Sequence, residues 1–282
     1  MTRGVSLLVV GKPSYARFYA NMALSIRKHS PDLKIQAIFE KGLSKHLYPF
    51  LQVWDELTII DNDDCYDLKG NLDPGKAKIS LYKYYKYDET IYLDVDGIIV
   101  KDITPLFEQE RDFIIQKDAM HWANNTEIIT HFKLDPASEI FGSNSSIQFI
   151  RKGKQTETIY KEAVKAMREP LPLNKQSNSW FGRQPDELYF SIGMAKAGII
   201  DPYFEGWPVY FRNRMQYGQA INLHDIIKDH YAIGSYGSDR FNHKSVRQNY
   251  DSQNKVNWNE LVNLNPYNEY KHFYLMKKKH NK

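Results

Sequence analysis

Residues 90–100 have the sequence Thr-Ile-Tyr-Leu-Asp-Val-Asp-Gly-Ile-Ile-Val, in which an apolar run leads directly into two acidic residues. The run at 91–93 predicts a buried strand, and Asp94 and Asp96 follow it with one residue between them. Because strand side chains alternate, we expect both carboxylates on one side of a sheet edge, where they can hold Mg²⁺ or Mn²⁺ and leave positions open for phosphates. Gly97 permits a tight turn and close approach by a ligand. A solvated turn with two acids is the alternative that the motif alone leaves open.

The chain before this stretch alternates between strand and helix patterns. Apolar or alternating runs predict strands at 5–10, 33–39 and 56–60, and helical spacing predicts helices at 15–30 and 43–54. This rhythm is typical of a parallel α/β sheet with helices on its faces. Ligands of such sheets bind outside the carboxyl ends of the strands, which is where both 11–15 and 94–97 are expected.

The remaining elements are predicted from shorter patterns. A helix is expected at 76–87, a turn into a short helix at 102–107, strands at 113–116 and 143–150, and helices at 157–168 and 188–197. Asp186 precedes the last helix, as its cap or as an acid aimed outward. Beyond residue 201 the chain is aromatic and rich in loops, and no element is predicted there.

Composition limits the class of protein. A chain of 282 residues with 42% hydrophobic residues can bury a substantial core, in one large domain or in one domain with a smaller lobe. The net charge of +4 suits an anionic ligand without requiring nucleic acid. The single cysteine, Cys65, excludes an intramolecular disulfide and favours a reducing compartment. No apolar run is long enough for a transmembrane segment, so we expect a cytoplasmic protein. Nothing in the sequence indicates its oligomeric state.

Several motifs together resemble the glycogenin-like retaining glycosyltransferases, which have the nucleotide-sugar-binding fold called GT-A. The segments that carry the resemblance are Lys78 with Leu81 and Tyr87, Ile-Tyr-Leu-Asp94-Val-Asp96, Ile103-Thr-Pro-Leu-Phe107, Asn144-Ser145-Ser146, Asp186-Glu187, and His230-Tyr-Ala with Gly234. The resemblance implies a mixed, mostly parallel α/β sheet flanked by helices. It also divides the chain into a catalytic domain at 1–240 and a C-terminal extension at 241–282, packed on that domain or trailing from it.

The resemblance implies a role for each matching residue. The residues expected to hold the donor sugar are Asn144, Asp186 and Glu187, with Asp186 the candidate for contact with the anomeric face. The residues expected to bind the nucleotide part of the donor are Gly11, Lys12, Tyr15, Lys78, Asp94, Val95, Gly234 and Arg240. Lys78 would pair with phosphate or with the Asp-x-Asp segment. The expected metal ligands are Asp94, Asp96 and His230.

Two departures from the family pattern fall near His230. One extra residue precedes Gly234, and a lysine that the family places after the histidine is missing, so Arg240 is the candidate to replace it. His224 competes with His230 as the third metal ligand.

The function implied is metal-dependent transfer of a sugar from a nucleotide-diphosphate sugar, expected to be a UDP-sugar used with Mn²⁺ or Mg²⁺, with retention of configuration. The expected acceptor is a glycan or glycolipid. A hydroxymethylated base in DNA is the alternative, because the C-terminal run Lys277-Lys-Lys-His280 and the aromatic, arginine-bearing region 203–214 suit a nucleic acid.

A different enzyme class competes for the same motif. The segment 93–100 is also similar to the nucleophile segment of haloacid-dehalogenase-like phosphohydrolases, with Asp94 as nucleophile and Asp96 as general acid. Against it, Ile98 stands where that family has threonine, the motif lies far from the start of the chain, and no later metal-binding segment of that type is found.

Overall fold

The computed structural model describes residues 1–11, 13, 16–47, 51, 53–67, 69–95, 97–118, 126–137, 139–169, 185–211 and 227–234. Four expected site residues lie outside these ranges: Lys12, Tyr15, Asp96 and Arg240. His224, the competing metal ligand, and the expected extension at 241–282 lie outside them too. None of the described helices is long and apolar enough to span a membrane.

The main sheet has six strands in the order β3-β2-β1-β4-β7-β6. The strands are β1 (Arg3–Val9), β2 (Lys34–Glu40), β3 (Glu56–Ile60), β4 (Glu89–Leu93), β6 (Phe113–Lys117) and β7 (Ser143–Arg151). The pairs β1–β2, β2–β3 and β1–β4 are parallel, whereas β7 runs antiparallel to both β4 and β6. The predicted mixed, mostly parallel sheet is therefore confirmed.

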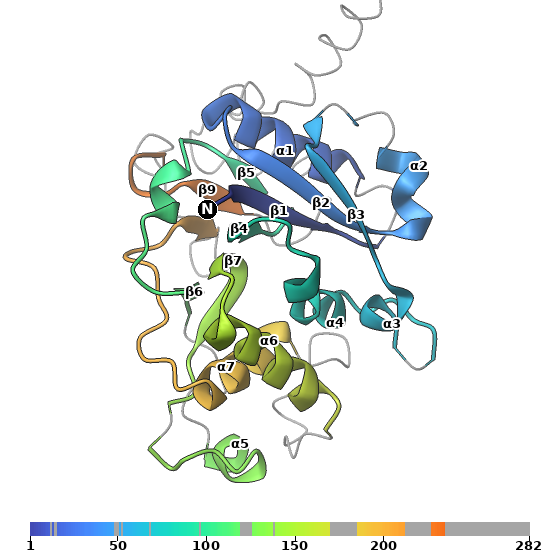
Figure 1. The fold of residues 1–282 in the computed structure, drawn as a ribbon. Helices are drawn as coiled ribbons and strands as arrows, with labels where there is room; N and C mark the ends of the chain where they lie inside the picture. Colours follow the sequence, from blue (N-terminus) through green and yellow to red (C-terminus); the bar gives the residue numbers. More distant parts are fainter. Residues whose placement is uncertain are drawn as a thin grey trace, which may run out of the picture.

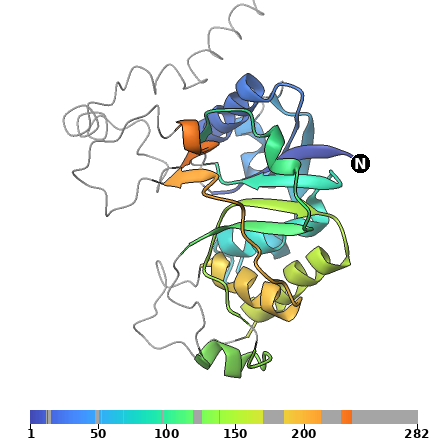
Figure 2. The same cartoon turned by 90° about the vertical axis from the view of Figure 1, so that its left-hand side faces the viewer.

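A second, three-stranded sheet joins distant parts of the chain. It has the order β5-β9-β8, with β5 (Gly97–Ile99) antiparallel to β9 (Ala232–Gly234) and β9 parallel to β8 (Val209–Phe211). Figure 2 shows β8 and β9, in orange, beside α1 (Ala16–His29). Since β5 follows β4 after a three-residue break, this small sheet brings residues near 210 and 234 to the carboxyl end of β4.

Helices cover both faces of the main sheet (Figure 1). Helix α1 lies on one face, and α4 (Pro74–Ile79), α6 (Lys154–Met167) and α7 (Asp186–Lys196) lie on the other. The shorter helices are α2 (Ser44–Leu47), α3 (Asn62–Cys65) and α5 (Thr126–His131), with 3-10 turns at Lys41–Leu43, Leu81–Tyr84 and Thr104–Phe107.

The helix predicted at 76–87 is wrong in its bounds. Asp73 accepts a hydrogen bond from the backbone N–H of Lys76 at 3.1 Å and Pro74 occupies the first turn, so α4 begins two residues earlier. It ends at Ile79, and a separate 3-10 turn follows. In that turn the Tyr84 hydroxyl donates to Asp64 at 2.5 Å, which ties the turn to α3.

Strand alternation divides the core into two layers. On β1, Val5, Leu7 and Val9 pack on the face covered by α1 and the small sheet, while Leu8 packs on the face covered by α4, α6 and α7. Helix α7 is buried along most of its length, including Leu188, Phe190, Ile192 and Met194, so its first turn has a fixed position against the sheet.

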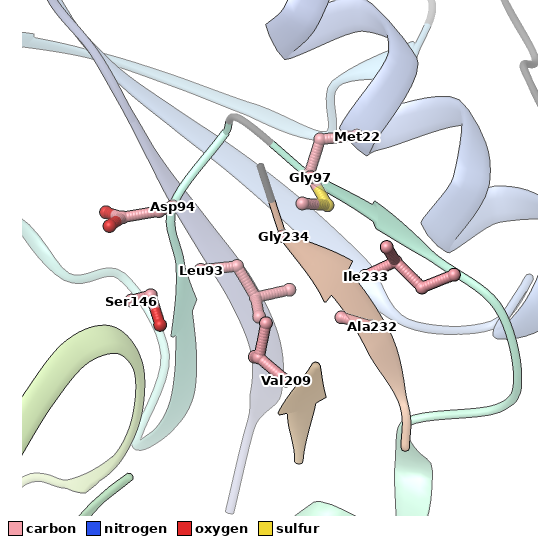
Figure 3. Close-up of a pocket in the computed structure, with 9 residues that line it drawn as sticks. All are labelled: Met22, Leu93, Asp94, Gly97, Ser146, Val209, Ala232, Ile233 and Gly234. Carbon is pink, nitrogen blue, oxygen red and sulfur yellow. The ribbon is translucent and has the colours of Figure 1, made fainter. Parts of the chain in front are cut away.

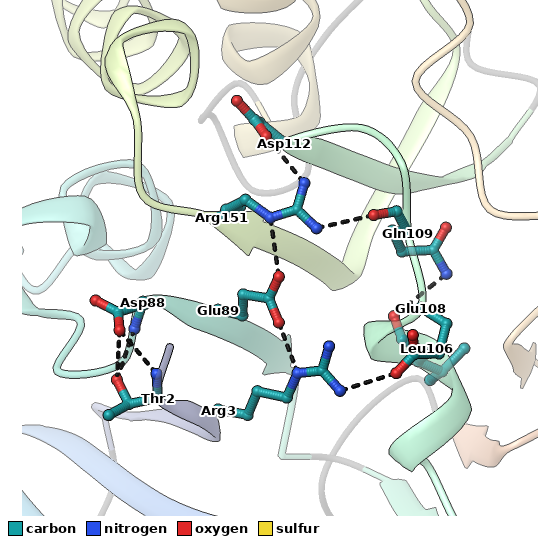
Figure 4. Close-up of polar contacts among 9 residues, drawn as sticks. All are labelled: Thr2, Arg3, Asp88, Glu89, Leu106, Glu108, Gln109, Asp112 and Arg151. Atoms are coloured by element: carbon teal, nitrogen blue, oxygen red, sulfur yellow. Dashed lines mark hydrogen bonds and ion pairs between the residues drawn. The ribbon is translucent and has the colours of Figure 1, made fainter.

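The amino end of β4 is fixed by a network of charges (Figure 4). Glu89, only 2% exposed, accepts from Nε of Arg3 at 2.7 Å and from Nε of Arg151 at 2.9 Å. Burial alone would raise the pKa of Glu89, but the hydrogen bonds from Arg151 and Arg3 outweigh it and lower that pKa. Because the three residues lie on β4, β1 and β7, the network sets the register of the strands whose other ends carry the site.

Close packing of α6 against α7 leads to a prediction about Gly193. A Cβ at this position would lie 2.3 Å from the carbonyl oxygen of Ile159, a backbone atom that cannot turn aside. We expect Gly193→Ala to lower the free energy of unfolding by about 1–3 kcal/mol, the usual result of overpacking. Chemical denaturation measures it. Gly42→Ala, which meets nothing within 4 Å, is the control and should change stability by less than about 0.5 kcal/mol. Equal effects would contradict the packing described here.

Candidate functional site

The ammonium group of Lys78 lies at the centre of a group of acids. Its Nζ is 2.9 Å from Oδ1 and 3.1 Å from Oδ2 of Asp94, 3.3 Å from Oδ2 of Asp186 and 2.9 Å from Oγ of Ser145. An ammonium has three N–H donors, so these three residues occupy all of them. Burial alone would lower the pKa of Lys78, but Asp186 and Asp94 outweigh it and hold that pKa above its ordinary value. Lys78 therefore stays charged and binds the Asp-x-Asp segment, one of its two expected partners.

Asp94 occupies the position that its sequence predicts, directly after β4. Its backbone N–H donates to the carbonyl of Ser146 at 2.8 Å, and its Oδ1 accepts from the hydroxyl of Tyr92 at 2.6 Å. The Asp94 side chain remains 30% exposed, whereas that of Lys78 is 11% exposed. The carboxylate is thus held firmly from the inside and open to solvent on its outer side.

A break in the sheet ladder brings β7 into the site. On β6, Ile115 pairs with Gln148 of β7, but the next residue, Gln116, pairs with Asn144. The residues between Asn144 and Gln148 therefore have no partners on β6. Such irregularities commonly redirect side chains next to active sites. Here the shift accompanies the contacts of Ser145 with Lys78 and with the first turn of α7.

Two acids enter the site from the start of α7. Asp186 and Glu187 are the first residues of this helix, where its dipole favours negative charge. Oδ2 of Asp186 is 2.5 Å and Oε1 of Glu187 is 3.1 Å from Oγ of Ser145. Burial, and then the charge of Asp186, raise the pKa of Glu187 to about 7, although Lys78 opposes the shift. The cap residue is Pro185, so Asp186 is not the cap of this helix. Its carboxylate is not aimed outward either, because it is bound to Lys78 and Ser145 and its side chain is only 15% exposed.

Asn144 has a local role in the structure. Its Oδ1 accepts from the backbone N–H of Ser146 at 3.0 Å and from the Ser146 hydroxyl. The residue is 6% exposed. The amide therefore stabilises the irregular part of β7, and its expected contact with the donor sugar stays a prediction.

Figure 3 shows a small pocket beside the end of β4. Its lining includes Asp94, Gly97, Ser146 and Gly234. Gly234 thus lines the same pocket as Asp94, while the carboxylate of Asp94 is directed away from both glycines. A Cβ on Gly97 would lie 2.7 Å from the carbonyl oxygen of Ile233, so the neighbour that requires glycine in this structure is strand β9.

Gly11 and Val95 lie near the same edge of the sheet. Gly11 follows β1 with a φ of 107°, which favours glycine, and its N–H lies 3.4 Å from Oε1 of Glu40. Val95 is partly buried against the core layer that includes α1. Their roles in binding a nucleotide stay predictions.

The structure does not bring His230 together with Asp94. Gly234 pairs with Gly97, beside the site, whereas His230 precedes β9 at its opposite end. There its Nδ1 lies 2.6 Å from the carbonyl oxygen of Trp207, and its ring lies 5.2 Å from that of Tyr210. The choice between His230 and His224 stays a prediction, because neither His224 nor Asp96 is among the described residues.

Among the described residues, no group of three or more His, Cys, Asp and Glu side chains could by itself hold a metal. Asp94 nevertheless fits one position in the coordination of Mg²⁺ or Mn²⁺, because its carboxylate is a hard oxygen ligand, partly exposed and fixed in place. Asp96 would supply the second ligand.

Sequence reasoning missed two residues of this site. Ser145 bridges Lys78 and the acids of α7, and Tyr92 orients Asp94. The alternation of β4 places Tyr92 and Asp94 on one face, so the tyrosine could have been found. No pattern in the sequence indicates the irregularity of β7 that positions Ser145.

Three glycosyltransferases are among the solved structures similar to this one. The galactosyltransferase LgtC, in complex with donor and acceptor sugar analogs, matches with a TM-score of 0.57 and 13% identity over 92% of this chain and 94% of that one. The apo structure of the bifunctional glycosyltransferase WbbM matches with a TM-score of 0.56 and 13% identity over 89% of this chain and 52% of that one. The glycosyltransferase GlyE of Streptococcus pneumoniae TIGR4 matches with a TM-score of 0.51 and 17% identity over 93% of this chain and 63% of that one. No family model and no curated protein matches the sequence.

These likenesses show the fold. The chain has the GT-A fold that the resemblance implied, with its six-stranded mixed sheet and flanking helices. The chain spans nearly all of the LgtC structure, about half of WbbM and under two thirds of GlyE. The closer relationship to glycogenin-like enzymes stays a prediction.

The central place of Lys78 leads to a prediction about stability. Lys78→Met keeps the length of the side chain but leaves Asp94 and Asp186 without their shared cation, so we expect a loss of about 3–5 kcal/mol in the free energy of unfolding at pH 8. The loss should shrink at pH 5, because Glu187, whose pKa burial and Asp186 raise to about 7, is then protonated and one of the repelling charges is gone. Urea titrations at both pH values measure it. Lys86→Met, at an exposed position, is the control. A loss below about 1 kcal/mol at pH 8 would show that the ion pairs contribute little.

Proposed function

We propose that this protein is a metal-dependent glycosyltransferase that moves a sugar from a nucleoside-diphosphate sugar, most simply a UDP-sugar, to a glycan or glycolipid, with retention of configuration. The observation that carries the proposal is the set of acids around buried Lys78, placed at the carboxyl end of β4 in a GT-A fold.

The leaving group explains why a site of this kind would suit the reaction. As the bond to the sugar breaks, negative charge develops on the diphosphate and must be stabilised in a site that excludes water. A divalent metal held by Asp94 and Asp96 would neutralise that charge. Lys78 is already occupied by Asp94, Asp186 and Ser145, so its part is to fix the direction of Asp94, and the Tyr92 hydroxyl holds the same carboxylate through Oδ1.

The acids of α7 suit the sugar end of the donor. Positive charge develops at the anomeric carbon as the leaving group departs, and an ionised carboxylate beside it is stabilising. Asp186 is bound to Lys78 and Ser145, so its position is fixed before the donor arrives. Asp186 would therefore face the anomeric centre, and Glu187 would lie beside it.

The nucleotide would lie along the carboxyl edge of β1. Gly11 follows that strand with a positive φ, and Lys12 and Tyr15 come next in the sequence. Sheets of this kind bind ligands where the carboxyl ends of neighbouring strands meet, and β1 and β4 are parallel neighbours. Base and ribose near β1 would place the diphosphate near β4.

The acceptor is proposed from the similar structures. LgtC is described in complex with donor and acceptor sugar analogs, which supports a carbohydrate acceptor in preference to DNA. The phosphohydrolase alternative gains no support from the fold, since the similar structures reported above are glycosyltransferases.

The test is a scan of nucleotide sugars with Mn²⁺, Mg²⁺ or excess EDTA, following release of the nucleoside diphosphate. We expect turnover of one donor class, its loss in EDTA, and a fall of at least about tenfold in Asp94→Asn, because a charged ligand and the partner of Lys78 are removed together. Asp88→Asn is the matched control. Asp88 precedes β4 at its opposite end and bonds Thr2, so its loss should not affect turnover.

Three results would oppose the proposal. Full activity in excess EDTA would show that the reaction needs no metal. Release of phosphate from simple phosphomonoesters, with no use of nucleotide sugars, would favour the phosphohydrolase. Binding to hydroxymethylated DNA that weakens steeply with salt would favour the nucleic-acid acceptor.

A further inference from the structure

Ser145 has more hydrogen-bond partners than its single hydroxyl hydrogen can serve. Its Oγ lies 2.9 Å from Nζ of Lys78, 2.5 Å from Oδ2 of Asp186 and 3.1 Å from Oε1 of Glu187. Lys78 carries only donors, so it must donate to Oγ. The two carboxyl oxygens then compete for the one hydroxyl hydrogen.

The distances indicate which carboxyl receives it. Oγ lies 2.5 Å from Asp186 but 3.1 Å from Glu187, and a short O–H···O contact is typical of a charged acceptor. Oε1 of Glu187 then faces the remaining lone pair of Oγ. The backbone N–H of Ser145 donates to the same Oε1 at the longer distance of 3.5 Å. The 3.1 Å contact with Oγ still lacks a hydrogen, and two lone pairs at this distance repel each other, whereas a proton on Oε1 would turn the contact into a hydrogen bond.

The charges around Glu187 favour the same proton. From α4 it is faced by Lys78, from the end of β4 by Asp94, and from α7 by Asp186, while β7 contributes the uncharged Ser145. With every acid ionised this group would carry three negative charges and one positive charge in a partly buried site. Protonation of one acid removes a repulsion that burial strengthens. The raised pKa of Glu187, about 7, agrees with this count.

We propose that Ser145 is a positioning residue that holds Glu187 as a neutral carboxylic acid, with its proton directed at Ser145 Oγ, while Asp186 remains ionised. This inference rests on the proposed function, in which the donor sugar would meet one charged carboxyl and one neutral carboxyl. Glu187 would then offer its second oxygen, Oε2, as an uncharged acceptor for a sugar hydroxyl. Above neutral pH the ionised Glu187 would repel the anionic donor.

The direct test is titration of the free protein, without metal or donor, by ¹³C NMR of labelled glutamate carboxyls. The Glu187 signal is the one absent in Glu187→Gln. We expect it to titrate near pH 7 in the wild-type protein. In Ser145→Ala the neutral acid loses its hydrogen-bond acceptor, so the midpoint should fall by roughly half a unit to one unit. Ser145→Thr, which keeps the hydroxyl, should restore it. If Ser145 instead donates to an ionised Glu187, the midpoint in Ser145→Ala will rise, and the proposal is wrong.

Stability gives a second readout that does not require Ser145→Ala to fold. A carboxyl whose pKa is raised from 4.5 to about 7 on folding makes the wild type lose stability as pH rises between these values, with no further loss above them. The melting temperature of Glu187→Gln relative to wild type should therefore rise from pH 5 to pH 7 and then level off. A difference that does not change with pH would overturn the proposal.

Kinetics separates this inference from the proposed function. In the wild type the KM for the donor should rise above pH 7, and this rise should be absent in Glu187→Gln, whatever the kcat of that variant. If the protein turns over no nucleotide sugar, the proposed function is wrong. The NMR and stability measurements still decide where the proton lies. A rise in KM that persists in Glu187→Gln would show that another group is responsible.

Discussion

The site depends on one buried cation, the ammonium of Lys78. Asp94 follows β4, Ser145 belongs to β7, and Asp186 begins α7, and each contacts the same Nζ. Carboxylates brought this close together repel one another and would not remain ionised without a cation between them. The lysine therefore allows a strand end, an irregular strand and a helix start to meet at one point. Any ligand that approaches this point meets side chains whose directions are already set.

The sheet explains why these elements can meet here. Glu89 and its two arginines fix β1, β4 and β7 at one end, and Lys78 gathers residues at the other end of β4. Antiparallel β7 runs back past the carboxyl end of β4, so Ser145 and Ser146 lie beside Asp94. If β7 were parallel to β4, its amino end would lie beside the amino end of β4, away from Asp94. The mixed topology is therefore what brings β7 into the site.

Much of the fold could be predicted, because the strands of the first half are short apolar runs separated by clear turn residues. The position of Asp94 followed from the same pattern. The small sheet could not be predicted, since β8 and β9 are three residues each and pair with β5 only through distant contacts. Ser145 was missed because a shift in strand register leaves no trace in the sequence. For His230 the local sequence suggested a ligand, whereas the register of β9 sets it at the end away from Gly97.

The central claim is that a nucleotide sugar binds where β4, β7 and α7 meet. Hydrogen–deuterium exchange of the whole protein, with and without a turned-over nucleotide sugar and Mn²⁺, tests it most directly. The account predicts that the donor slows exchange in three separate segments, around Asp94, Ser145 and Glu187, while the amino end of β4 near Glu89 is unaffected. Protection confined to other parts of the chain, with these three segments unchanged, would contradict it.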